Sequence, residues 1–532
     1  MRSLEKNKPL LFPLITGIML IVYSWFLSYP LSIDSPGDFV FNHISVLYWF
    51  GLPLTLASMY MIAVTSKRNS VKWIMTAGIV MTMYSLSYFY YMLPGSDSSS
   101  TRGLTEFLIK TKNLDSSQPS HSYFQWPSLF ILANTITSVT GLGLATVEFL
   151  VYAIIGFLLA TTLYAYASKA SKNGGLAVIA FFVVMFNFLN YQFVPFSLAF
   201  GLLLLLFMLE SRQRSSGVII AMLAIFVGIT LTHAFVPLFF VLYLLIQSVL
   251  TRNKQYGKLF LLTLIIYLTV QFALASTGFA NNILSVMASS SEYSQIATIK
   301  LPAPVPIDAI AQMLAGIVEI AFGITCLAGF ILLLVKRKMR SLDKAIFLTG
   351  LIYSGVGVIL YILGSRAIAI AFIPISLGAP YLLENRFRSY LKSLFLVLLI
   401  LLVFVPVHSS FYDRYIFFQT KEAYQAEHFM IDYYNWTTPS LVLAHAPVVE
   451  YLRPNLGAKE VNATSLERDD SSLFPRLREY DSILYTVGLG NSFLKYNYTL
   501  EGVLYDEKLN VVYSNGFSDI MVKGSSFASA LP

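Results

Sequence analysis

Apolar runs separated by short polar segments dominate the sequence. Ten of these runs approach the roughly 20 residues that an α-helix needs to cross the hydrocarbon core of a bilayer. They lie at about residues 10–29, 45–65, 73–93, 145–167, 176–192, 217–235, 259–276, 309–335, 345–363 and 391–407. Three shorter runs, at 194–209, 236–250 and 366–383, each follow the outer end of another run. The pattern predicts an α-helical polytopic membrane protein with about thirteen transmembrane helices.

One further apolar segment, WPSLFILANTITSV at Trp126–Val139, is too short for a span and is followed by TGLG. Counting it as a span would place Lys169 and Lys172 outside and invert every later loop. We therefore interpret it as a helix that lies on, or dips into, the outer leaflet. It belongs to an outer loop over residues 94–144, in which we expect juxtamembrane helices.

The distribution of Lys and Arg sets the orientation, because the cytoplasmic loops of membrane proteins are enriched in both residues. With the N-terminus inside, 21 of these residues before position 408 fall in cytoplasmic segments. The outer segments hold five, namely Arg102, Lys110, Lys112, Lys300 and Arg366. The sequence thus predicts a multi-pass plasma-membrane protein with a cytoplasmic N-terminus, and it places all six histidines on the outer side.

Composition agrees with this assignment. Only 12% of the 532 residues are charged, against roughly 25% in soluble domains. The single cysteine, Cys326, excludes an intramolecular disulfide. The sequence contains no Walker A, G-x-S-x-G, H-E-x-x-H or Gly-rich nucleotide motif. These absences, with inner loops of only a few residues, argue against a cytosolic nucleotide-dependent site, and we expect no nucleic-acid partner.

The C-terminal segment, residues 409–532, has a different composition from the membrane domain at 1–408. It holds 15 of the 28 acidic residues, an amphipathic helical pattern at 420–434, and the β-type runs SLVLAH, SILYTV and NVVYSN. The N-x-[ST] sequons at Asn435, Asn462 and Asn497 are candidates for glycosylation. We expect a small extracytoplasmic α/β domain, and we find no catalytic motif in it.

Asp97 is the candidate catalytic residue, because it opens the outer loop just after Pro94-Gly95. A carboxylate in an outer-leaflet cavity can act as a general base. It can also bind a divalent metal ion, Mg²⁺ or Mn²⁺, together with His121 or Asp38. The alternative is an ordinary turn or cap residue before a helix over 102–110.

Arg366 and His233 are the candidate ligands for a phosphate group. Arg366 sits at an outer helix–helix turn where the charge rule disfavours a cation, and its guanidinium suits a bidentate phosphate contact. The alternative is an arginine that reaches to the lipid headgroups. His233, in LTHAFVP, lies at the outer end of a span and can donate to a phosphate or bond a backbone carbonyl. Two isolated acidic residues in spans, Glu148 and Glu319, do not form the row expected for ion transport.

These segments together resemble the GT-C superclass of integral-membrane glycosyltransferases, which use polyprenyl-phosphate-linked sugars. The resemblance rests on an outer loop opening with an aspartate, an aromatic-proline segment, a helical bundle and an outer C-terminal domain. It covers about residues 73–407 and is strongest to archaeal and other prokaryotic members. The segments that carry it are GSDSSSTRGLTEFLIKTKNLD, YFQWPSLFIL, NYQFVPFSLAFGLLLLLFML, LTHAFVPLFF and SRAIAIAFIPI.

The resemblance implies transfer of a sugar from a polyprenyl- or dolichyl-phosphate donor to a glycan or protein acceptor. It gives Asp97 the role of base or metal ligand and Arg366 that of phosphate ligand. The sequence differs from the pattern of the superclass in two ways. Ser98–Ser100 stand where many members have a second acidic residue. A W-W-D-type motif is absent, which argues against transfer of a whole glycan to asparagine.

A non-enzymatic membrane protein is the alternative. It would be a transporter, or a catalytically degenerate GT-C relative that serves as a scaffold in surface glycan assembly. A transporter often carries inverted repeats and broken helices, and the sequence shows neither.

Overall fold

The computed structural model describes most of the membrane part of the chain and the strands of the C-terminal part. The described residues are 8–29, 44–89, 93, 96–114, 123–171, 173–185, 193–211, 215–275, 306–360, 364–385, 440–444, 461–465, 482–486, 509–514 and 518–523.

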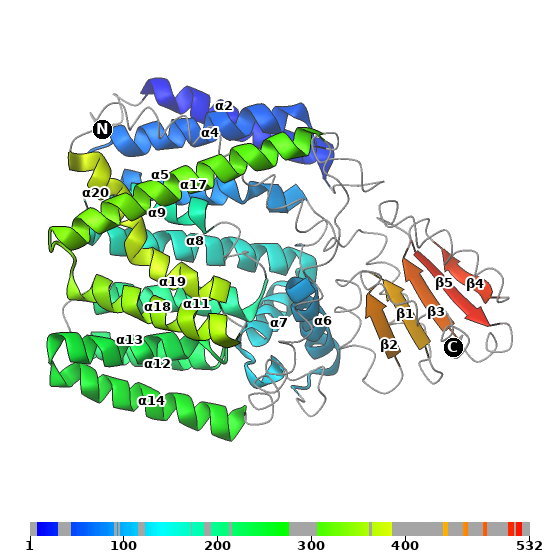
Figure 1. Cartoon of the computed structure of the whole chain (residues 1–532). Coiled ribbons are helices and arrows are strands. Elements are labelled where there is room, and N and C mark those ends of the chain that lie inside the picture. Colours follow the sequence, from blue (N-terminus) through cyan, green and yellow to red (C-terminus); the bar gives the residue numbers. More distant parts are fainter. Residues whose placement is uncertain are drawn as a thin grey trace.

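The described part of the chain is mostly helical, and the helices run side by side in a bundle (Figure 1). The elements of the bundle and its outer loop are α2 (Lys8–Ser28), α4 (Val46–Thr65), α5 (Asn69–Met83), η1 (Ser85–Phe89), α6 (Ser96–Thr111), α7 (Ser128–Thr140), α8 (Leu144–Ala170), α9 (Gly174–Val184), α11 (Pro195–Glu210), α12 (Ser216–Thr230), α13 (Val236–Thr251), α14 (Lys254–Leu274), α17 (Pro306–Val335), α18 (Ser341–Leu360), α19 (Gly364–Ser376) and α20 (Gly378–Asn385).

Local sequence explains where several of these helices begin and end. α11 and α13 both begin at a Phe-Val-Pro tripeptide, and each has its proline in the first two positions. A proline is favourable there because its fixed φ suits the helix and its missing N–H has no partner in the first turn. α7 ends at Gly141, whose φ of 70° is the left-handed conformation of a glycine C-cap.

The lengths of the helices establish a multi-pass membrane protein. Among the described residues, α2, α4, α8, α14 and α17 are long and apolar enough to cross a membrane. α17 carries an exposed apolar stripe at helical spacing, which suits a lipid-facing surface: Ile317, Ile320, Ile324, Leu327 and Ile331 are each 49–63% exposed.

The predicted number of thirteen spans is not confirmed. Several helices at the predicted positions are shorter than a full span, such as α9 with 11 residues and α13 with 16. The run predicted over 73–93 divides into α5 and η1, because the helix ends at Met83. The span predicted at 391–407 lies outside the described residues. The short helix predicted at 126–139 is present as α7.

The C-terminal part contains a five-stranded sheet in the order β2-β1-β3-β5-β4. Its strands are β1 (Ser440–Ala444), β2 (Val461–Ser465), β3 (Ser482–Thr486), β4 (Leu509–Ser514) and β5 (Ser518–Lys523). β1 pairs in parallel with β2 and β3, and β5 pairs antiparallel with β3 and β4. Three strands lie at the predicted β-type runs, and β2 and β5 were not expected. The helix predicted over 420–434 lies outside the described residues, so an α/β domain at 409–532 stays a prediction.

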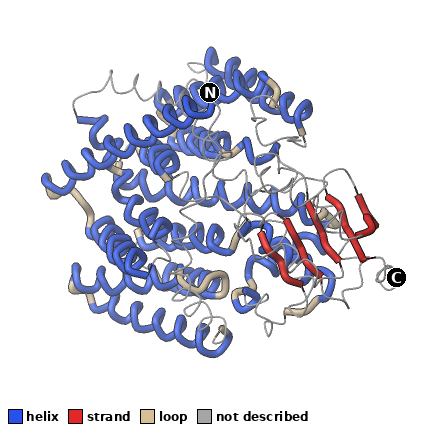
Figure 2. The backbone as a smooth tube through the Cα atoms, turned by 45° about the vertical axis from the view of Figure 1, so that its right-hand side comes forward, coloured by secondary structure: helices blue, strands red, loops and turns tan. Residues whose placement is uncertain are grey.

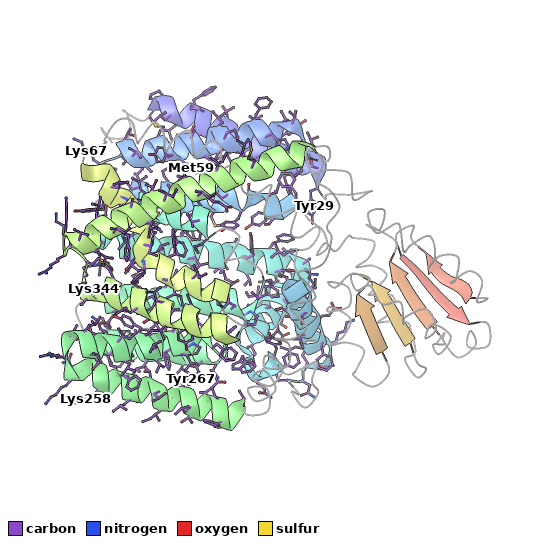
Figure 3. The ribbon with its side chains drawn as sticks, in the orientation of Figure 1. Tyr29, Met59, Lys67, Lys258, Tyr267 and Lys344 are labelled. Atoms are coloured by element: carbon purple, nitrogen blue, oxygen red, sulfur yellow. The ribbon has the colours of Figure 1, made fainter. Side chains whose placement is uncertain are left out.

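The two ends of the bundle differ in character. Lys67, Lys258 and Lys344 lie at one end (Figure 3). α6 and α7 lie at the opposite end, on the side where the sheet is found (Figure 1). The turned view in Figure 2 also shows the sheet to one side of the helical bundle. The position of Lys67, Lys258 and Lys344 at one end agrees with the segments that the sequence assigns to the cytoplasmic side. The side of the membrane that each end faces stays a prediction.

Close contact between α2 and α4 depends on two glycines. A Cβ atom added at Gly51 would lie 2.8 Å from the carbonyl oxygen of Gly17 and 2.9 Å from Cβ of Leu20. Small residues at such points let helix backbones approach closely in a membrane. The contact therefore requires glycine at position 51.

We expect Gly51→Ala to lower the stability of the protein by about 1–3 kcal/mol, the usual cost of overpacking. The measurement is the thermal unfolding midpoint of the purified protein in detergent, followed by tryptophan fluorescence. Gly228→Ala is the matched control, because no atom lies within 4 Å of the added methyl group. Equal midpoints for the two variants would show that the α2–α4 contact tolerates a side chain.

Candidate functional site

Helix α6 begins earlier than the sequence suggested. We expected a helix over 102–110 with Asp97 in the turn before it, but α6 starts at Ser96. Asp97 therefore lies in the first helical turn. A negative charge at this position is favourable, because the N-terminus of a helix carries a partial positive charge. Asp97 is placed here by its backbone alone, since its side chain lies outside the described part of the structure.

A buried ion pair fixes α6 to the bundle. Nε of Arg102 donates to Oε2 of Glu148 at 2.8 Å, and its Nη2 donates to Oε1 at 2.9 Å. Nη2 also donates to the carbonyl oxygen of Leu93 at 3.2 Å. Both side chains of the pair are 0% exposed. A bidentate contact of this kind holds both distance and angle, so α6 has a fixed position over the first turns of α8.

The loop that α6 opens has an apolar core of its own. Leu104 and Leu108 of α6 pack with Phe124 and with Phe130 of α7. The rings of Phe124 and Phe130 are edge to face at 5.4 Å. These contacts fold α6, the segment at 123–127 and α7 into one unit at the end of the bundle.

Trp126 joins this unit to the helices beneath it. Its side chain is 1% exposed and packs with Ala234 and Ala275. Its indole Nε1 donates to Oε1 of Gln271 in α14 at 3.3 Å. Trp126 is part of the aromatic-proline segment, so this segment packs against Ala234, the residue after His233.

His233 lies between α12 and α13 and orders the start of α13. Its Nδ1 accepts from the backbone N–H groups of Phe235 at 3.1 Å and Val236 at 3.4 Å. The ring also contacts Phe196 edge to face at 5.7 Å. Because Nδ1 is an acceptor, the proton of the neutral ring is on Nε2. Nε2 can then donate to an anionic oxygen.

A cavity of about 50 Å³ joins α6 to His233. It is lined by Ser100, Thr101, Leu104, Tyr123, Val194, Pro195, Phe196 and His233. These residues come from α6, from the segment before α7, from the start of α11 and from the α12–α13 turn. The structure thus brings His233 to the helix that carries Asp97, across more than a hundred residues of sequence. A volume of this size holds a few water molecules or one small polar group.

Ser98 and Ser99, two serines of α6, have buried hydroxyl groups. Ser98 and Ser99 are 0% and 1% exposed, and neither hydroxyl has a hydrogen-bond partner among the described residues. A buried hydroxyl without a partner costs about 1–3 kcal/mol. They lie in α6 directly before Ser100 and Thr101, and they do not belong to the cavity lining.

Arg366 lies in α19, which begins at Gly364. Figure 1 shows this start at the end of the bundle where α6 and α7 lie. The side chain of Arg366 lies outside the described part of the structure, so its place in a site shared with Asp97 stays a prediction.

The remaining predicted site residues are mostly outside the described residues. These are His121, Asp38, Asn435 and Asn497. Asn462 lies in β2, an edge strand, opposite Leu441 of β1. Within the described residues, no group of three or more His, Cys, Asp or Glu side chains is placed to hold a metal ion. The side chain of Asp97 lies outside the described part, so a divalent metal with Asp97 stays a prediction.

The sequence analysis missed the Arg102–Glu148 pair and the hydroxyl groups of Ser100 and Thr101. It treated Glu148 as an isolated residue and Arg102 only as an outer charge. One signal was available, because both are ionisable residues next to apolar segments and each needs a partner there. Their separation of 46 residues hid the pairing.

No protein-family model matches the sequence and no curated protein matches it. The structure is similar to two crystal structures of ArnT from Cupriavidus metallidurans. The apo structure is 11% identical, with 86% of this chain and 99% of that chain covered and a TM-score of 0.42. The structure bound to undecaprenyl phosphate is 11% identical, with 85% and 98% covered and a TM-score of 0.39. Values this low assign no activity to the present chain.

We expect Glu148→Leu to lower the free energy of unfolding by about 3–5 kcal/mol, because it leaves the Arg102 charge buried without its partner. Adding Arg102→Met should restore most of the loss, since an apolar pair of similar volume replaces the ion pair. Thermal unfolding in detergent measures both effects.

Lys110→Gln is the control for this pair. It removes the ion pair between Lys110 and Glu106 on the same helix, at 3.2 Å, in which the Lys110 side chain is 38% exposed. Its effect should stay under about 1 kcal/mol. A Glu148→Leu variant as stable as Lys110→Gln would show that the buried pair does not hold α6 in place.

Proposed function

We propose that this protein is a GT-C-like membrane glycosyltransferase that moves a sugar from a polyprenyl-phosphate donor to an acceptor hydroxyl at the α6 end of the bundle. The observation that carries the proposal is the cavity shared by α6 and His233. It joins the helix with Asp97 in its first turn to a histidine whose Nε2 is the proton-bearing nitrogen in the neutral ring.

The division of roles follows from the chemistry of each group. Asp97 is acceptor-only when ionised and serves as the general base. Arg366 and His233 supply donors for the phosphate oxygens of the donor lipid. The cavity has space for only one small polar group, so the lipid and most of the sugar extend from it along the apolar helices.

The reaction is a displacement at the anomeric carbon. The acceptor oxygen forms a bond to this carbon while its proton passes to the carboxylate of Asp97. The bond between the carbon and the phosphate oxygen breaks, and the polyprenyl phosphate leaves with the electron pair. Arg366 and His233 would stabilise the negative charge that grows on the leaving phosphate.

Loss of the general base is the direct test. We expect Asp97→Asn to reduce the transfer rate about 10²–10⁴-fold, because the amide keeps the size of the side chain but cannot accept the proton. The measurement is mass spectrometry of lipid-linked glycans in a deletion strain that expresses the variant at the normal level. Glu106→Gln, which removes a carboxylate elsewhere on α6, should leave the glycans unchanged.

Full complementation by Asp97→Asn would instead support a catalytically degenerate relative that acts as a scaffold. Such a protein would keep α6 in place for structural reasons, and its function would not need a carboxylate at position 97.

An assay of lipid-phosphate binding distinguishes the proposed role of Arg366 from that of Asp97. We expect Arg366→Ala to weaken the binding of undecaprenyl phosphate to the purified protein about 10- to 100-fold, the effect of losing one charge-assisted hydrogen-bond partner. Arg366→Lys should fall between Arg366→Ala and the wild type, because a lysine keeps the charge but not the bidentate geometry. Asp97→Asn should bind as the wild type does. Equal affinity for all three variants would remove Arg366 from the site.

A further inference from the structure

A second cavity lies at the end of the bundle opposite α6. Its volume is about 220 Å³, several times that of the cavity beside His233. It is bounded by the end of α8, the turn between α17 and α18, and the contact of α19 with α20. Its charged lining residues are Lys169, Lys338, Arg340 and Asp343.

Among the described lining residues, the one carboxylate is already held by an arginine. Nε and Nη2 of Arg340 donate to the two carboxylate oxygens of Asp343 at 2.9 and 2.7 Å. The hydroxyl of Tyr166 donates to the same carboxylate, and the Arg340 guanidinium lies 5.1 Å from the Tyr166 ring. Asp343 and Arg340 neutralise each other, so the lining residues that the structure describes have a net positive charge from Lys169 and Lys338.

Contacts with neighbouring groups position both lysines at the cavity. Lys338 lies 5.8 Å from the centre of the Tyr381 ring, a cation–π contact in which the ammonium group keeps its charge. Lys169 donates to the carbonyl oxygen and the hydroxyl of Ser211, both at 2.8 Å.

An apolar wall lies beside these charges. Leu333, Met339, Pro374 and Leu377 line the same cavity. A ligand with an anionic group and an apolar chain would match both the lysines and the apolar wall of the cavity. Basic pockets between transmembrane helices bind the headgroups of anionic lipids in this way.

We propose that this cavity is a binding site for a phosphate group carried by an anionic membrane lipid. The ammonium groups of Lys169 and Lys338 contact the phosphate oxygens, and the acyl chain follows the apolar wall. The site is separate from the α6 end and does not depend on the proposed reaction. It would join α8, α17 and α19 at the end of the bundle where the lysines gather (Figure 3).

The test is a titration of the full-length protein in a neutral detergent, followed by isothermal calorimetry. The probes are dioctanoyl phosphatidylglycerol, dioctanoyl phosphatidylcholine and inorganic phosphate. We expect phosphatidylglycerol to bind and phosphatidylcholine, which has no net charge, not to bind. Lys338→Gln and Lys169→Gln should each weaken the binding of phosphatidylglycerol about fivefold, the contribution of one lysine near an anionic lipid.

Lys258→Gln is the matched control, because Lys258 is an exposed lysine at the same end of the bundle that does not line the cavity (Figure 3). It should bind phosphatidylglycerol as the wild type does. Unfolding midpoints without lipid show that the variants are folded. Lys169→Gln loses the contacts with Ser211 and can therefore be less stable. If it is, the result for Lys338→Gln decides the test.

Each outcome has a consequence for the proposal. Inorganic phosphate binding as tightly as phosphatidylglycerol, with the same loss in Lys338→Gln, supports the anion site and assigns it to free phosphate. Equal affinity for phosphatidylglycerol in Lys338→Gln and Lys258→Gln overturns the site. Binding of phosphatidylcholine as tightly as phosphatidylglycerol overturns it as well.

Discussion

The Arg102–Glu148 ion pair is the contact on which the arrangement of α6 and α7 over the bundle depends. It places a charge from α6 against a charge from α8 with both side chains fully buried. Taking two charges out of water is costly, and only near-ideal geometry offsets that cost. The bidentate contact, with a further bond to the carbonyl of Leu93, meets this requirement. Because a small displacement of α6 would break these bonds, the pair allows one position for the helix.

The candidate site follows from that position. With α6 fixed, Ser100 and Thr101 line a cavity with His233, and Asp97 lies one turn away at the start of the helix. The aromatic contacts of Phe124 and Phe130 and the hydrogen bond of Trp126 hold the rest of the loop over the bundle. A rigid frame of this kind is what positioned catalysis needs, since donors and bases act only within hydrogen-bond reach. The two cavities therefore have different polar linings: hydroxyl and imidazole groups beside α6, and Lys169, Lys338 and the Arg340–Asp343 pair at the other end.

Much of the helical part could be predicted from the sequence because the membrane imposes a simple rule. Backbone polar groups in a bilayer must bond within their own segment, so a long apolar run is a helix. This rule predicted α2, α4, α8, α14 and α17 and, by its short length, α7. It failed where length alone does not fix the boundary, as at α5, which ends at Met83, and at α6, which begins at Ser96. After α5 the chain continues as η1, where the carbonyl oxygen of Tyr88 accepts from the indole of Trp25, so a backbone group there has a partner outside its own segment.

The sequence by itself determined that this is a multi-pass helical membrane protein, and it selected Asp97 and His233 as residues of interest. It could do so because hydropathy, charge and turn residues are local properties of the chain. Only the tertiary structure decided that Arg102 bonds Glu148, that His233 shares a cavity with Ser100 and Thr101, and that Lys169 and Lys338 line another. These are contacts between segments from 46 to 169 residues apart along the chain. Such contacts depend on how helices of similar composition pack in three dimensions, and an apolar pattern that suits many neighbours equally does not specify which ones are chosen.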